Sequence, residues 1–515
     1  MVAACIAALM LSACGAAAPG DGENRSVGEG SPPVQGGTAN ILQPAEPRSL
    51  DPAALSNSWS HHPVIGNALY GTLMTLDPET LEVGYKIATD FVGSDEGRTF
   101  TLTLRPDVVF SDGTPLDAAA VKFNWDRLRD PDLASTAIRQ AAQVTGTEVI
   151  DDRTLKVTLP EPNANFVHGI VNTSMNWIAS PSALSEGREA FDENPVGAGP
   201  FTLAEWTRQD TIELDKNPDY WDAPKPYLDG LSIRMPTDTN QRFNALTTGA
   251  ADLSTEASGK ILSMAGDAGL MTESVATGGG QFIALNLRRA PFDDERARRA
   301  VALAVDAEAI DSAVYEGTAQ TRDFLFPESS PFHRDITFPA RDAESAQKLF
   351  DELASEGKPV KFTFLSYPTP ESRGLGESLQ AQLSTFENVE VDVEIADYPA
   401  ATARAGARDF DAMISTAVIQ DPDYALWTAF HGDSPGNVTG IDDDALDAAL
   451  DVGRTSTSMD VRSQAYATVQ ERLVALNPAV WTIRAAPSTI WRESIHGVEL
   501  YAWGSPLPEE LWLGK

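Results

Sequence analysis

One pentapeptide has the spacing of a hydrolase nucleophile. The run Gly432-Asp433-Ser434-Pro435-Gly436 satisfies Gly-x-Ser-x-Gly, in which the serine attacks an acyl carbon and the next backbone N–H stabilises the oxyanion. Pro435 has no N–H and cannot supply that donor. The flanking residues also indicate a loop and not a strand-to-helix elbow. We expect a turn without catalytic function, and an exported serine hydrolase is only a remote alternative.

The residues that could bind a metal or a phosphate lack the required spacing. None of the six histidines stands in a His-Glu-x-x-His motif, and the adjacent pair His61 and His62 is more typical of a polar surface. Asp442 to Asp444 lacks the glycine of a calcium loop. No metal and no cofactor are expected.

Three consecutive glycines, Gly278 to Gly280, could let a ligand approach the main chain. They lack the Lys-Ser/Thr of a phosphate loop, and they precede an expected strand over residues 282–287 instead of a helix. The run is expected either to face a ligand, through Gly279 and Gly280, or to be merely flexible.

The charge balance argues against one class of partner. The 515 residues include 38 Lys and Arg against 75 Asp and Glu, a formal net charge of -37. Such a chain repels nucleic-acid phosphates and anionic lipid headgroups. The simplest interpretation is a solvated acidic surface on an exported protein, which we expect to be a monomer. Nucleic acid is not expected as a partner.

The N-terminus has the pattern of an exported lipoprotein. Residues 1–13 are apolar, too few to span a bilayer, and end in Leu-Ser-Ala before Cys14. Cys5 and Cys14 are the two cysteines, so cleavage before Cys14 would leave one that carries lipid and could form no internal disulfide. Residues 14–37 would form a lipid anchor and flexible tether. The expected location is extracytoplasmic, anchored to the outer face of the cell membrane, or periplasmic.

Periodicity predicts an α/β protein. Residues 99–104 alternate as a half-buried strand, and Asp117 can cap a following helix. Residues 361–366, 371–385 and 389–395 form a strand-helix-strand unit. Such a unit is typical of a doubly wound lobe.

The most diagnostic stretch runs from Asn194 to Met235. Gly197 to Pro200 predicts a turn that feeds a hairpin, and Asn217-Pro218 ends its second strand. This Gly-Ala-Gly-Pro-Phe hairpin before Asn-Pro-x-Tyr-Trp resembles the large solute-binding proteins of peptide/nickel-type ABC importers, bacterial solute-binding protein family 5. RPDVVFSDGTPL, at Arg105 to Leu116, is also similar to that family's Leu-Arg-x-x-Val-x-Phe-x-Asp-Gly-x-Pro-Leu motif.

The resemblance implies an α/β, bilobal periplasmic-binding-protein-like fold of type II, in the large three-domain form, with a hinge and an interlobe ligand cleft. The implied parts are a signal peptide (1–13), an anchor and tether (14–37), a discontinuous lobe I core (38–76, 197–282 and 490–515), an additional domain packed on lobe I (77–196) and lobe II (283–489). The implied function is that of a substrate-binding lipoprotein, not an enzyme, that captures an extracellular solute by hinge closure and delivers it to an ABC permease. A peptide is the default ligand. An oligosaccharide, an opine-like compound or a nickel or other metal chelate is the alternative.

The expected ligand-binding residues are charged, aromatic or small. Peptide-binding relatives place an amine-binding aspartate before an Asp-Pro; here Val418 falls at that place, and Asp421 and Asp423 are the nearest substitutes. Arg484 is the candidate for a ligand carboxylate. If Val418 is the better guide, the cleft holds a neutral, hydroxyl-rich solute between tryptophans. The other expected contacts are Asn57, Trp59, Gly279, Gly280, Trp427 and Trp481, with Trp503 a further aromatic candidate.

Overall fold

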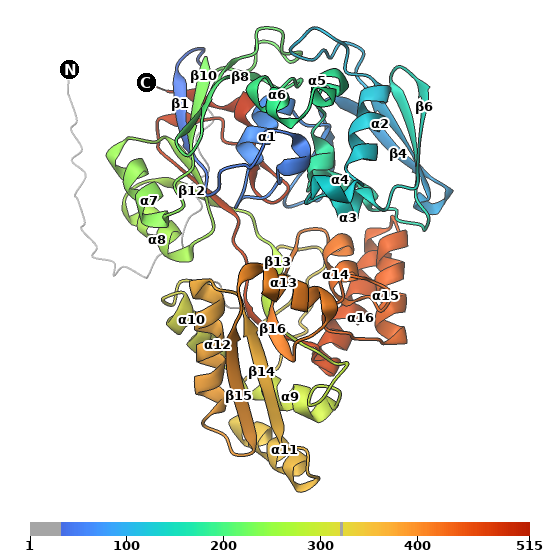
Figure 1. The fold of residues 1–515 in the computed structure, drawn as a ribbon, viewed down its shortest axis with the longest axis vertical. Coiled ribbons are helices and arrows are strands. Elements are labelled where there is room, and N and C mark those ends of the chain that lie inside the picture. The colour runs from blue at the N-terminus through green and yellow to red at the C-terminus, as the bar shows by residue number, and fades with distance from the viewer. Residues whose placement is uncertain (1–31, 320–322, 515) are drawn as a thin grey trace, which may run out of the picture. The chain divides into compact units, whose positions relative to one another are not determined.

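The computed structural model describes residues 32–319 and 323–514. The expected signal peptide, Cys14 and most of the tether lie outside these residues. Three large sheets organise the part of the chain from Val34 onward, and we name three regions after them (Figure 1). None of the described helices is long and apolar enough to cross a membrane.

Lobe I is the region built on a seven-stranded sheet. Its strands, in spatial order, are β12 (Met271–Ser274), β18 (Ser488–Trp491), β11 (Leu253–Glu256), β1 (Thr38–Leu42), β10 (Gly230–Arg234), β9 (Thr211–Lys216) and β8 (Phe201–Thr207). Strands β8 and β9 confirm the hairpin expected after Gly197 to Pro200. Gly199 is required there because a Cβ atom would lie 2.2 Å from the carbonyl oxygen of Ala68 in helix α1 (Pro63–Tyr70). Helices α7 (Thr239–Thr248) and α8 (Gly259–Asp267) complete the lobe.

The added domain is the region built on a four-stranded antiparallel sheet. Its strands are β4 (Ala88–Ser94), β5 (Thr99–Leu104), β7 (Thr154–Thr158) and β6 (Gly146–Asp151), and its helices are α2 (Ala118–Arg127), α3 (Ile138–Ala141), α4 (Phe166–Val171), α5 (Pro181–Ser185) and α6 (Arg188–Glu193). The strand expected over 99–104 is confirmed as β5, with alternate residues buried. The expected cap is also confirmed, because Asp117 Oδ1 accepts a hydrogen bond of 2.8 Å from the N–H of Ala120.

Lobe II is the region built on a five-stranded sheet. Its strands are β15 (Val389–Ile395), β14 (Val360–Ser366), β16 (Ala412–Ile419), β13 (Gly278–Leu285) and β17 (Ala479–Ile483). Its helices are α9 (Glu295–Ala304), α10 (Ala307–Val314), α11 (Ala343–Ser355), α12 (Pro370–Leu383), α13 (Tyr398–Ala407), α14 (Pro422–Phe430), α15 (Asp444–Thr455) and α16 (Met459–Leu476). The expected strand-helix-strand unit is confirmed as β14, α12 and β15, with the two strands parallel.

The triple glycine lies inside a strand and not before one, so the expected strand start at residue 282 was wrong. Strand β13 begins at Gly278, and all eight of its residues pair with β16. Gly279 and Gly280 have φ values of 63° and 121°. A Cβ atom on Gly280 would lie 2.1 Å from the carbonyl oxygen of Ile483 in β17. Close packing between strands therefore explains the glycines.

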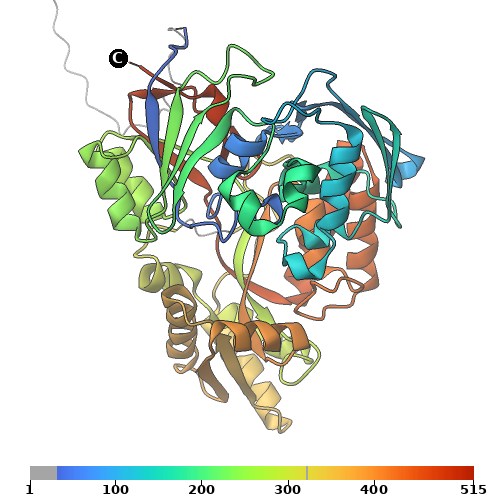
Figure 2. The same ribbon diagram turned by 45° about the horizontal axis from the view of Figure 1, so that its top comes forward.

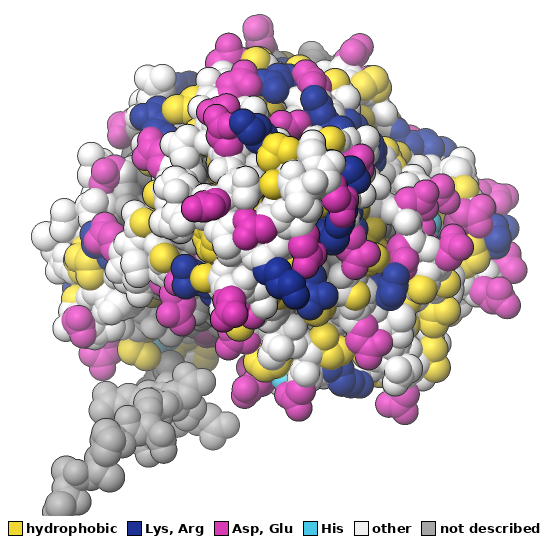
Figure 3. Space-filling view, turned by 90° about the horizontal axis from the view of Figure 1, so that it is seen from below, with side chains coloured by type: hydrophobic (Ala, Val, Ile, Leu, Met, Phe, Trp, Pro, Cys, Tyr) yellow, Lys and Arg dark blue, Asp and Glu magenta, His cyan; other side chains and the backbone are white. Residues whose placement is uncertain are grey.

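Lobe II is packed directly against the added domain. Helices α14 to α16 lie beside α3 and α4 in both ribbon views (Figures 1 and 2). One hydrophobic cluster is continuous across this boundary, because it includes Phe100 and Ile170 of the added domain together with Tyr466 and Leu473 of α16. On the face drawn in Figure 3, acidic side chains are spread among basic and apolar ones.

Candidate functional site

A cavity of about 1120 Å³ is lined by all three regions. Lobe II supplies most of the wall, from β16, the start of α12, α13 and one face of α14. The added domain supplies Arg139, and lobe I supplies Ser60 and Trp503. Residues that are distant in sequence therefore meet around one space, which is large enough for a small organic ligand.

Arg139, on the short helix α3, is the cation on the added-domain side of the cavity. It forms no hydrogen bond or ion pair with any described residue, and its side chain is exposed. Its charge acts on Tyr424, another lining residue: burial raises the pKa of the Tyr424 hydroxyl, and Arg139 opposes that shift. An unpaired guanidinium can bind a carboxylate through two parallel hydrogen bonds.

The lobe II wall carries one more cation and one carboxylate. Arg408 donates to the carbonyl oxygens of Ala405, at 3.2 Å, and Pro435, so its guanidinium is partly occupied. Glu371 lies in the first turn of α12 and has no hydrogen bond or ion pair with a described residue. Within described parts of the lining, the charged side chains are thus two arginines and one glutamate.

Aromatic and hydroxyl groups fill the space between these charges. The ring centroids of Tyr367 and Tyr398 lie 5.0 Å apart, and Tyr398 is 61% exposed. Trp503 packs edge-on against Trp59, with 6.5 Å between ring centroids. The wall can therefore both stack on flat groups and hydrogen-bond polar ones.

The structure places Asp421 and Asp423 in ion pairs next to the cavity, not in its lining. Asp421 caps α14 and receives two hydrogen bonds, of 2.8 and 2.7 Å, from Arg462. Asp423 receives one of 2.8 Å from Arg454. The two carboxylates are 2% and 4% exposed. Val418, by contrast, lines the cavity.

Arg484 and Trp481 also lie outside the lining. Arg484 donates to the carbonyl oxygen of Phe324 at 2.8 Å, and burial lowers the pKa of its guanidinium. Trp481 is 3% exposed and packs on Phe282, with 4.7 Å between ring centroids. Trp481 therefore sits in the interior of lobe II, and Arg484 is half-buried.

The remaining expected contacts have partners of their own. Asn57 is 2% exposed and donates to Val171 O at 2.8 Å and to the Tyr501 hydroxyl at 3.0 Å. Trp427 lies between the Arg454 guanidinium, 4.0 Å from its ring centroid, and the ring of His431, at 4.5 Å. Gly279 and Gly280 pack against the neighbouring strands. Ligand contact by the nine expected residues stays a prediction.

Sequence reasoning missed Arg139, Glu371, Tyr398 and Arg408. Arg139, Glu371 and Tyr398 stand in ordinary helical segments, and Arg408 is the residue that follows α13. Nothing in the local spacing singles out any of the four. Only the meeting of α3 with α12, α13 and α14 gives these residues a common environment.

Polar contacts fasten the added domain to lobe II beside the cavity. The amide nitrogen of Asn165 lies 3.2, 2.9 and 3.2 Å from the carbonyl oxygens of Gly453, Arg454 and Ser456 at the end of α15. The side-chain NH₂ group of Asn165 donates to these carbonyl oxygens and so caps the C-terminal end of α15, a helix of lobe II. His168 Nδ1 lies 2.9 Å from Asp421 Oδ2.

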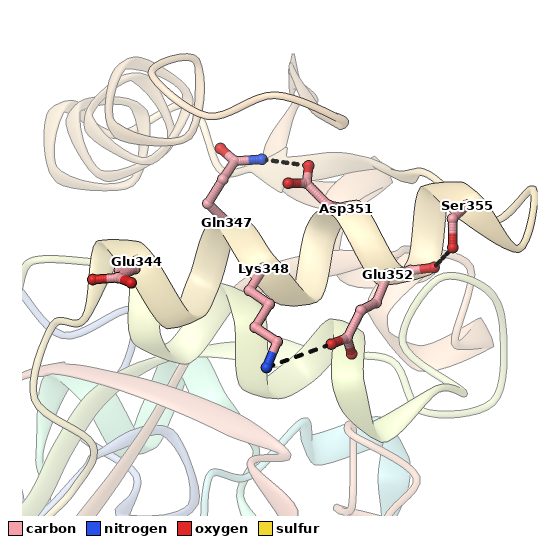
Figure 4. A pocket seen from close by; sticks show the side chains of 6 residues that line it. All are labelled: Glu344, Gln347, Lys348, Asp351, Glu352 and Ser355. Atoms are coloured by element: carbon pink, nitrogen blue, oxygen red, sulfur yellow. Dashed lines mark hydrogen bonds and ion pairs between the residues drawn. The ribbon is translucent and has the colours of Figure 1, made fainter.

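A second hollow, of about 630 Å³, is lined by α11 alone (Figure 4). Its side chains pair along the helix: Gln347 donates to Asp351 at 2.8 Å, and Lys348 lies 4.0 Å from Glu352. Because no other element forms a wall, this hollow cannot enclose a ligand.

The serine of the Gly-x-Ser-x-Gly run lies in a loop and not at a strand-to-helix elbow. Ser434 is buried in the loop after α14, where its hydroxyl donates to Thr428 O at 2.7 Å. No group of three or more His, Cys, Asp or Glu in residues 32–319 and 323–514 is placed to hold a metal ion.

Comparison with known proteins gives matches over much of the chain. A sequence model described as bacterial extracellular solute-binding proteins, family 5 Middle, matches residues 82–437. A glutathione-binding protein of Salmonella paratyphi A is 29% identical over 313 residues, which are 59% of this chain and 59% of the relative. The chain thus covers about three fifths of the length of such curated relatives.

Two solved structures share the fold over more than nine tenths of the chain. The periplasmic binding protein AgaA of A. tumefaciens R10, in complex with agropinic acid, gives a TM-score of 0.78 at 23% identity, covering 93% of this chain and 99% of that one. The periplasmic binding protein DppA of Helicobacter pylori, in complex with the peptide STSA, gives 0.77 at 24% identity, covering 94% and 99%. The expected α/β fold of the type II binding-protein class is confirmed.

Proposed function

The chain belongs to family 5 of the bacterial extracellular solute-binding proteins, and from this premise we propose that it captures a solute outside the cytoplasm and delivers it to an ABC permease. The cavity shared by the three regions is the proposed solute site. Its task is physical and not catalytic. It replaces the water around a polar solute with fixed hydrogen bonds and aromatic walls.

One observation carries the proposal. Arg139 of the added domain and Glu371 of lobe II are both unpaired and both line the cavity, from opposite regions of the fold. A polar solute that contacts both would favour the arrangement in which the regions are close together, which is the basis of capture by hinge closure.

A peptide is the proposed default ligand, because the H. pylori structure holds a peptide and the Salmonella relative is named for glutathione. An opine-like solute is the second candidate, since the A. tumefaciens structure holds agropinic acid. We further propose that Cys14 carries a lipid that anchors a monomer to the outer face of the membrane.

We expect solute binding without turnover. At a ligand concentration of 100 times Kd, binding stabilises the folded state by about 2.7 kcal/mol, which raises the melting temperature. Native mass spectrometry of the full chain with mixed tripeptides, followed by analysis of the released ligand, checks this. The ligand should be retained and recovered intact, and recovery of hydrolysed peptide would contradict the proposal.

The contact at Asn165 gives a prediction about closure. Asn165→Ala removes the donor to three carbonyl groups of lobe II and should cost about 1–2 kcal/mol at that contact. Spin labels on the added domain and on α15 should then report a longer mean distance. Asn124→Ala is the matched control, because Asn124 donates only within the added domain, to Ala120 and Ala179. An unchanged distance in Asn165→Ala would rule out a closing role for this contact.

A further inference from the structure

We propose that Gln420 joins lobe II to lobe I in the closed arrangement and thereby slows the release of the solute. We call its hydrogen bond to Ala502 the latch. This inference rests on the proposed function, because it takes closure as the step that captures the solute. It adds a positioning residue that lies outside the cavity lining.

The latch is one buried hydrogen bond between two regions. The side-chain NH₂ group of Gln420 donates to the carbonyl oxygen of Ala502 at 2.9 Å. Gln420 lies between β16 and α14 of lobe II, whereas Ala502 lies between β20 (Leu500–Tyr501) and β21 (Ser505–Pro506), in the C-terminal segment of lobe I. Both residues are buried, and Ala502 belongs to the same hydrophobic cluster as Ile419 of β16. The bond therefore forms within an apolar boundary between the regions.

The acceptor is fixed on its own side of this boundary. The N–H of Ala502 donates to the carbonyl oxygen of Leu76 at 2.9 Å. The hydroxyl of the preceding residue, Tyr501, donates to Asn67 Oδ1 at 2.8 Å and accepts from Asn57 Nδ2 at 3.0 Å. Ala502 has a φ of 49°, a conformation that alanine rarely adopts and that persists only where the surroundings hold it. Its carbonyl group therefore has a fixed direction.

The donor is fixed on the lobe II side. Gln420 directly follows Ile419, which pairs with strand β13. It directly precedes Asp421, whose carboxylate receives two hydrogen bonds from Arg462. A side chain between two fixed neighbours has less conformational entropy to lose when it reaches its acceptor. The latch thus joins two rigid parts of the molecule.

The latch lies beside the cavity. Val418, two residues before Gln420, lines the cavity, and so does Trp503, the residue after Ala502. A solute that contacts both Val418 and Trp503 would keep the two ends of the latch at bonding distance. Solute contact and the latch therefore favour the same closed arrangement.

Gln470 in α16 shows what a purely structural buried amide looks like in this protein. Its NH₂ group donates to the carbonyl oxygens of Phe332 at 3.2 Å and Tyr466 at 3.1 Å, and all three residues belong to lobe II. The side-chain oxygens of Gln420 and Gln470 are both buried without a hydrogen-bond partner among the described residues. Opening of the lobes would break the bond of Gln420 and leave those of Gln470 intact.

Gln420→Leu tests the latch in the full chain. It removes the donor and leaves the Ala502 carbonyl buried without a partner in the closed arrangement, which is costly. With mixed tripeptides as the probe, dissociation should be about 10- to 100-fold faster than from the parent protein. The association rate constant should not fall, because the solute enters the open arrangement, in which the latch is already broken. Stopped-flow tryptophan fluorescence measures both rates.

A second readout needs no solute. Spin labels on α2 of the added domain and on α15 of lobe II should report a longer mean distance in Gln420→Leu than in the parent protein. Gln420→Met should behave like Gln420→Leu, because methionine keeps the length of the side chain without the donor. Gln470→Leu is the matched control. It should lower the melting temperature but leave the release rate and the distance between the labels unchanged.

The outcomes separate this inference from the proposed function. Release from both Gln420 variants at the rate of the parent protein, or equal acceleration in Gln470→Leu, would overturn the inference while solute binding stands. If the parent protein binds neither the tripeptides nor maltotriose, the proposed solute site fails. The distance between the labels then decides on the latch alone, and an unchanged distance in the Gln420 variants would overturn it.

Discussion

Replacing Arg462 by methionine is expected to lower the free energy of unfolding by about 3–5 kcal/mol, because it leaves a buried carboxylate without its main partner. Arg462 Nη2 lies 2.8 and 2.7 Å from the two oxygens of Asp421, and the side chains are 4% and 2% exposed. The same guanidinium donates to Gly453 O at 3.1 Å. Urea denaturation followed by tryptophan fluorescence measures the loss.

Arg472→Met is the matched control on the same helix. Arg472 also pairs with an aspartate, Asp443, but it is 33% exposed. Solvent screens such a pair, so its removal should cost less than about 1 kcal/mol. If the two variants lose the same free energy of unfolding, burial does not increase the contribution of the Arg462–Asp421 pair to stability.

The pH dependence of stability gives a second measurement on this pair. Burial alone would raise the pKa of Asp421, but the electrostatic effects of His168 and Arg462 and the hydrogen bonds to the carboxylate outweigh it, so the pKa lies well below its ordinary value. In the unfolded chain the pKa is about 3.9. A lower pKa in the folded state stabilises it above about pH 4, and this contribution is lost as the pH falls below that value. The stability gap between parent and Asp421→Asn should therefore narrow below about pH 4.

Replacing Gly280 by alanine is expected to cost about 2–5 kcal/mol, from backbone strain and overpacking together. The residue has a φ of 121°, which alanine rarely adopts. Its new Cβ atom would lie 2.1 Å from the carbonyl oxygen of Ile483 and 2.7 Å from the Cα atom of Arg484, both backbone atoms that cannot rotate away. The thermal midpoint of the protein should fall.

Gly266→Ala is the control for the glycine prediction. Gly266 lies in helix α8, where an added Cβ would meet nothing within 4 Å. Alanine favours a helix by about 1 kcal/mol over glycine, so this variant should be as stable as the parent or more so. If Gly280→Ala has the same midpoint as Gly266→Ala, the strand packing at Gly280 tolerates a side chain.

Local patterns were enough to predict several elements and the family. The strand at 99–104, the cap at Asp117 and the hairpin after Gly197 to Pro200 depend on residues within a few positions of one another. The same motifs carried the resemblance that the match over residues 82–437 confirms. Short-range propensity and turn chemistry can be read in this way because they are local.

The same local reading misplaced the start of β13. The glycines at 278–280 look like a flexible run in the sequence, yet they pair with β16 and lie against β17. Glycine is needed at these positions because neighbouring strands approach closely. A contact between segments that are distant in sequence cannot be seen in a local sequence pattern.

The sequence by itself therefore determined the fold class, the family and the individual elements, since each follows from nearby residues or from a motif. Only the tertiary structure decided which charges are free. Asp421 and Arg462 are 41 positions apart, and Asp423 and Arg454 are 31 apart, yet folding joins each pair and buries its carboxylate. Arg139 has no such partner and lines the cavity. The contribution of a charged side chain to stability or binding depends on its burial and on its neighbours in space. Both are set when the regions pack together.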